Sequence, residues 1–63
     1  LAATLRESDT GLVKLSVRAI PGYDATRVTV PFGGGGPKGA AGGTINMPLA
    51  EAARAVEEIM QKL

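Results

Sequence analysis

The 63-residue chain contains no cysteine, no histidine and no tryptophan, and only one tyrosine and one phenylalanine. The absence of cysteine excludes disulfide bonds and a thiol nucleophile, and the absence of histidine excludes imidazole acid–base chemistry and zinc sites of the Cys/His kind. Seven basic and six acidic residues leave a net charge of +1, which is too small for a general polyanion binder. Without cysteine, a long apolar run or a signal-peptide pattern, we expect a cytoplasmic protein with no membrane segment.

A chain of this length with 44% hydrophobic residues is expected to form one small domain, residues 1–63. A domain of this size buries only about 60% of the surface that its unfolded chain exposes, so its stability is marginal. The chain also begins with Leu1 rather than methionine. We therefore expect a fragment of a longer chain, stabilised by contact with a partner or with a missing domain.

The first twenty residues predict a β-hairpin with one buried face. Leu1 to Arg6 is short and apolar, and Ser8-Asp9-Thr10-Gly11 is a typical turn sequence. Leu12 to Ile20 then alternates with the period of a strand. One face of that strand carries Val13, Leu15, Val17 and Ala19, and the other carries Lys14, Ser16 and Arg18.

The segment from Tyr23 to Phe32 fits two structures. Asp24 suits the N-cap of a short helix with Ala25, Val28 and Phe32 facing inward. The β-branched residues Thr26 and Val28 to Val30 disfavour a helix, and Pro31 discourages helical geometry at the residue before it. The local chemistry narrowly favours an extended segment.

The C-terminal segment predicts an amphipathic helix that begins near Pro48. Its apolar residues recur at helical spacing: Leu49, Ala52, Ala53, Val56, Ile59, Met60 and Leu63. Thr44 to Met47 is expected to form a short strand before it. The predicted fold class is α+β, a small sheet with a β-hairpin, a glycine-rich loop and the C-terminal helix packed on one face.

The glycine-rich segment Gly33 to Gly43 is the main candidate for chemistry. Gly34, Gly36 and Gly39 satisfy G-x-G-x-x-G, but no helix opens after them, and a P-loop fails because Gly39 follows Lys38. Two interpretations stay open: an anion-binding nest of backbone N–H groups beside Lys38, and a flexible solvent-exposed connection.

The remaining polar residues offer binding rather than catalysis. Arg18, with Ser16 on the same strand face, could bind a phosphate through its guanidinium fork, although the residues alone favour a solvated polar face. The six acidic residues form no acid–base pair and no metal-ligand spacing. We therefore expect no catalytic and no metal-binding residues in this chain.

Several motifs occur in an order that resembles the DHH-associated domain at the C-terminal end of DHH-family phosphoesterases. They are Leu15-Ser16-Val17-Arg18, Pro21-Gly22-Tyr23-Asp24, Phe32-Gly33-Gly34-Gly35-Gly36 and Ala40-Ala41-Gly42, followed by the amphipathic helix. The resemblance covers roughly Val13 to Leu63. RecJ-like exonucleases, nano-RNases and cyclic-dinucleotide phosphodiesterases belong to that superfamily.

The resemblance implies that this domain holds a phosphorylated substrate, such as a short oligonucleotide or nucleotide, while a missing N-terminal domain supplies the metal-binding Asp and His residues. Manganese or magnesium would be bound there, and no cofactor in this chain. Carried onto this sequence, the binding residues are Arg18 and the backbone of Gly34, Gly35 and Gly36, with Ser16 a lesser candidate.

The sequence departs from the family at three places. Pro37 stands where the family usually has a histidine, which leaves Lys38 as the nearest cation, and Ala19 replaces a usual serine. The family has a helix before the glycine run, so the resemblance implies a short helix near Asp24. Two alternative functions stay open: a protein-interaction or homodimerisation module with a non-functional glycine loop, and a tRNA-related domain like that of alanyl-tRNA synthetases.

Overall fold

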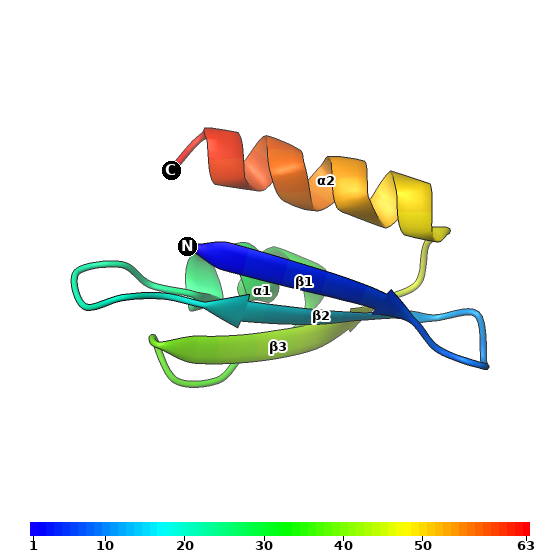
Figure 1. The fold of residues 1–63 in the computed structure, drawn as a ribbon, viewed down its shortest axis with the longest axis horizontal. Coiled ribbons are helices and arrows are strands. Elements are labelled where there is room, and N and C mark those ends of the chain that lie inside the picture. The colour runs from blue at the N-terminus through cyan, green and yellow to red at the C-terminus, as the bar shows by residue number, and fades with distance from the viewer.

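The computed structural model describes all residues from Leu1 to Leu63. In chain order the elements are β1 (Ala2–Glu7), β2 (Val13–Arg18), α1 (Thr26–Thr29), the 3-10 helix η1 (Val30–Phe32), β3 (Ala40–Ile45) and α2 (Leu49–Gln61). The strands form one antiparallel sheet in the order β1-β2-β3 (Figure 1). The predicted α+β class is therefore confirmed, including the hairpin and the C-terminal helix.

Strand β2 is the centre of the sheet and the source of most of the core. Val13, Leu15 and Val17 are buried, and the residues between them are exposed, so the predicted alternation is confirmed. Residues opposite each other in antiparallel strands point to the same face, so the pairing carries this alternation into β1 and β3. At the hairpin turn, the Ser8 amide donates to the Leu12 carbonyl at 2.7 Å.

Both helices cover the same face of the sheet. α1 contacts β2 and β3, while α2 contacts β1 and α1, so the strands lie in front of α1 in Figure 1 and α2 runs alongside β1. Ala25 and Val28 from the first helical region, and Ala52 and Val56 from α2, complete the core. No helix covers the opposite face of the sheet. Neither α1 nor α2 has the length and apolar character needed to cross a membrane.

The segment around Asp24 is helical, so the extended structure favoured by local chemistry is wrong and the helix implied by the family resemblance is confirmed. The Asp24 carboxylate accepts hydrogen bonds from the Thr26 amide, at 2.9 Å, and from the Thr26 hydroxyl. Val28 has no exposed surface. Burial of Val28 in the core outweighs the helix penalty of a β-branched residue, which is at most about 0.7 kcal/mol.

Strand β3 begins at Ala40, earlier than the predicted strand at Thr44. The glycine run lies along its outer edge: the Gly35 amide donates to the Gly42 carbonyl at 3.0 Å, and the Gly42 amide donates back at 2.9 Å. Two ends of the predicted loop therefore pair with each other. The glycine-rich segment is held against the sheet instead of forming a free connection.

Gly34 is required by this close approach, because an added Cβ would overlap with the Gly42 carbonyl oxygen. We expect Gly34→Ala to destabilise the fold by about 1–3 kcal/mol, the usual range for overpacking. Gly35→Ala is the matched control, because its Cβ would meet no atom within 4 Å. Urea denaturation of both variants checks this, and equal midpoints would contradict the tight contact.

Candidate functional site

Arg18 and Ser16 lie on the uncovered face of the sheet. Both are exposed on β2, where Arg18 pairs with Ala2 and Ala40, and Ser16 pairs with Thr4 and Gly42. Because Gly42 also pairs with Gly35, the predicted site residues Ser16 and Gly35 fall in one row across the sheet. Their backbones are two strand spacings apart, roughly 10 Å.

The turn that contains Pro37 and Lys38 lies at the same end of the sheet as Arg18. The Ala40 amide donates to the Pro37 carbonyl at 3.2 Å, which closes the turn immediately before β3. The Ala19 amide, next to Arg18, donates to the Gly39 carbonyl at 3.0 Å. The structure therefore brings the two predicted cations, Arg18 and Lys38, to neighbouring backbone positions.

Most of the predicted glycine cradle is used by the fold itself. The Gly34 amide donates to the Thr29 carbonyl at 2.9 Å, and the Gly35 amide is paired with Gly42. Among the three glycines expected to bind an anion, only Gly36 has an amide without a backbone acceptor, and its φ of 133° is a conformation that suits glycine. The amides of Lys38 and Gly39 also have no backbone acceptor. The backbone amides left free for a ligand are therefore those of Gly36, Lys38 and Gly39, and not those of Gly34 and Gly35.

The Asp24 carboxyl group has a pKa below its ordinary value. Its pKa is lowered, first by the hydrogen bond from the Thr26 hydroxyl, then by the bond from the Thr26 amide, and further by the positive charges of Lys38 and Arg27. The Lys38 carbonyl accepts from the Ala25 amide at 2.7 Å, which holds the turn beside this carboxylate. The positive charge of Lys38 thus has an acidic neighbour in Asp24.

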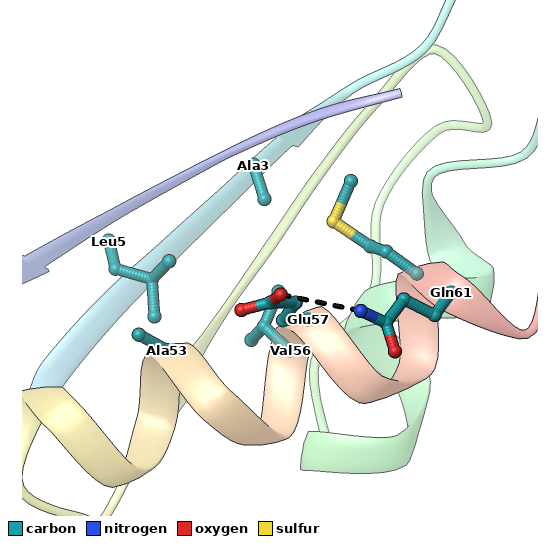
Figure 2. A pocket seen from close by; sticks show the side chains of 7 residues that line it. Ala3, Leu5, Ala53, Val56, Glu57 and Gln61 are labelled. Atoms are coloured by element: carbon teal, nitrogen blue, oxygen red, sulfur yellow. Dashed lines mark hydrogen bonds between the residues drawn. The ribbon is translucent and has the colours of Figure 1, made fainter.

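The largest hollow in the surface is a groove of about 400 Å³ between β1 and α2. In Figure 2, Ala3 and Leu5 of β1 face Ala53 and Val56 of α2 across it. Its only ionisable side chain is Glu57, whose carboxylate accepts from the Gln61 amide at 3.3 Å. The groove is suited to apolar contacts and has no set of groups for catalysis.

A second, smaller cavity of about 240 Å³ lies between the two ends of the chain. It is lined by Leu1, Gly22, Tyr23, Asp24, Arg27 and Leu63. The carboxylates are not gathered into any group of three that could hold a metal ion.

Two further cations on the uncovered face were not singled out by the sequence reasoning. Arg6 on β1 pairs directly with Lys14 on β2, and both are exposed. The uncovered sheet face, here called the open face, consists of Ala2, Thr4, Arg6, Lys14, Ser16, Arg18, Ala40, Gly42 and Thr44. Three of these residues are basic and none is acidic. The alternation in the first two predicted strands could have revealed this, because it places Arg6, Lys14 and Arg18 opposite the apolar face.

The hydrogen bonds of Asp24 predict a pH-dependent stability. A lowered pKa means that the contribution of Asp24 is fully present above its ordinary value of 3.8 and is lost as the pH falls through the lower folded-state value. We expect Asp24→Asn to destabilise the domain at pH 6 and to have little effect near pH 2. Denaturation curves at both pH values check this, with Asp9→Asn, on an exposed turn, as the control for removing a carboxylate. A difference that is the same at both pH values would contradict it.

No protein-family model, curated protein or solved structure matches the chain. The resemblance to the DHH-associated domain therefore rests on the motifs in the sequence.

Proposed function

We propose that this domain binds the phosphate of a phosphorylated substrate as an accessory domain of a DHH-type, metal-dependent phosphoesterase. The substrate class is a short oligonucleotide or nucleotide. In the family that the sequence resembles, a separate domain carries the metal-binding residues, so hydrolysis is assigned to such a domain and binding alone to this one.

The observation that carries the proposal is that Arg18 and the turn with Lys38 lie at the same end of the sheet. The two residues are linked through the bond between the Ala19 amide and the Gly39 carbonyl, and both are exposed. A guanidinium offers two parallel donors to a phosphate, and an ammonium adds a point charge. Pro37, in place of the family histidine, contributes no donor and fixes the turn that carries Lys38.

The free backbone amides of the same turn support the proposal. The N–H groups of Gly36, Lys38 and Gly39 have no backbone acceptor, and all three residues are exposed. An anion at this turn could accept from these groups, as in other glycine-rich anion sites. Because the Gly34 and Gly35 amides are hydrogen-bonded within the fold, Arg18 and Lys38 supply most of the affinity for phosphate.

Replacing the two cations should weaken phosphate binding. We expect Arg18→Gln and Lys38→Gln each to reduce the affinity for a 5′-phosphorylated mononucleotide by about tenfold, the effect of losing one charge-assisted hydrogen bond of roughly 1.5 kcal/mol. Amide NMR titration at low salt measures this. Shifts should be confined to residues 18–19 and 36–39.

Arg54→Gln is the matched control, because Arg54 is an exposed cation on α2, away from the open face. It removes the same charge and should leave the affinity unchanged. Equal affinities for the wild-type protein, Arg18→Gln and Lys38→Gln would refute the proposed function.

A protein-interaction module is a second candidate, favoured by the edge of β1. This strand pairs with β2 on one side only, and the apolar groove between β1 and α2 opens beside its free edge. Unpaired strand edges are common sites of association between chains. A second copy of the domain is the partner that this function would require.

Under this second function the protein should sediment as a dimer at concentrations near 100 µM. Ala53→Glu places a charge in the groove lining and should produce monomers. Ala50→Glu adds the same charge to an exposed position of α2 outside the groove and should leave the dimer intact. A wild-type monomer at all concentrations would exclude this function.

A further inference from the structure

Arg6 and Lys14 form a second concentration of positive charge on the open face. They lie directly opposite each other in the pairing of β1 with β2, and both are exposed. Opposed residues of neighbouring antiparallel strands have Cβ atoms about 5 Å apart. No acidic residue shares the open face, because Glu7 pairs with Val13 and belongs to the helix-covered side. The two cations therefore have no carboxylate partner on their face.

This arrangement is unfavourable for the fold alone. Like charges directly opposite each other in a sheet repel and reduce its stability. An anion bound between them converts that repulsion into two attractive contacts, and Arg6 can offer the planar fork of its guanidinium. A like-charged pair on an otherwise small and polar face is therefore better explained by an anionic ligand than by packing.

The pair lies too far from Arg18 to contact the same phosphate. Lys14 and Arg18 are four residues apart on β2, which at the rise of an antiparallel strand corresponds to about 13 Å. The row between them consists of Thr4, Ser16 and Gly42. These residues are small, two of them carry hydroxyl donors, and none would obstruct a ligand lying along the strand.

We propose that Arg6 and Lys14 form a second phosphate subsite, and that the ligand of this domain is a single-stranded nucleic acid whose backbone lies along the open face. The inference rests on the proposed function, because Arg18 and Lys38 supply the first subsite. The open face has no aromatic residue on which bases could stack. Recognition is therefore by the phosphate backbone, without base preference.

The net charge of +1 does not reveal this site, because it sums basic and acidic residues that lie on different sides of the domain. The basic residues Arg6, Lys14 and Arg18 are on the open face, whereas Glu51, Glu57 and Glu58 are on α2, which packs on the covered side. Charge is thus segregated between the two sides of the domain. A strand of phosphates is complementary to the open side, although the protein as a whole is nearly neutral.

The experiment compares a 5′-phosphorylated thymidine mononucleotide with a 5′-phosphorylated thymidine trimer, by NMR titration from 50 to 200 mM salt. The wild-type protein should bind the trimer at least tenfold more tightly. The double variant Arg6→Gln/Lys14→Gln should lose that gain and bind the mononucleotide normally. Its log K against log salt should be less steep by roughly 0.7, because the pair neutralises one phosphate and each neutralised phosphate of a single strand contributes about 0.7. Its melting temperature should equal or exceed that of the wild type.

Arg54→Gln/Lys62→Gln removes the same charge from α2 and the chain end and should keep the full gain for the trimer. The inference is overturned if Arg6→Gln/Lys14→Gln also keeps that gain, or if its melting temperature falls, which would show a structural role. It is also overturned if phosphatidylserine vesicles bind while the trimer shows no gain. The proposed function fails separately, by unchanged mononucleotide binding in Arg18→Gln and Lys38→Gln.

Discussion

The alternation of side chains along β2 is the constraint on which the other features of the fold depend. Val13, Leu15 and Val17 are buried, and hydrogen bonding on both edges of this central strand forces β1 and β3 to share its two faces. The chain buries only nine hydrophobic residues, enough to pack one side of the sheet against the helices. The other side has no layer to cover it and is therefore polar. The same alternation that builds the core thus presents Ser16 and Arg18 on an accessible face.

The glycine run contributes to the fold in a way that limits its use as a binding loop. Pairing of Gly35 with Gly42 adds one isolated bridge to the outer edge of β3. The backbones approach so closely there that a Cβ on Gly34 would overlap with the Gly42 carbonyl. Amide groups engaged in this contact are not available to a ligand. What the contact provides is position: it fixes the start of the turn that brings Lys38 next to the end of β2. The cations, more than the glycine amides, determine what this end of the sheet can bind.

The hairpin and α2 were predictable because their apolar periods are strong and local. α1 was not, since its residues prefer extended structure, and only burial of Val28 and the bonds to Asp24 make it helical. The first four residues of β3 were missed for a related reason: Ala40 to Gly43 has little strand propensity and becomes a strand because β2 and Gly35 supply partners on both edges. Arg18 and Lys38 could be selected from motifs. The juxtaposition of Arg6 and Lys14 needs the register of the hairpin, which the residue spacing alone does not specify.

Two surfaces of this domain, the β1 edge with its groove and the open face, suit different kinds of partner. The free edge of β1 offers unpaired backbone groups and the groove beside α2 is mostly apolar, so association there depends on backbone hydrogen bonds and buried area and is less sensitive to salt. The open face has basic residues at both ends and no acidic residue, so binding there depends on charge and weakens as salt rises. Because β1 contributes Leu5 to the groove and Arg6 to the open face, one strand belongs to both surfaces. A protein paired through the edge of β1 would still present its open face, and two such copies would join their open faces into one wider basic surface.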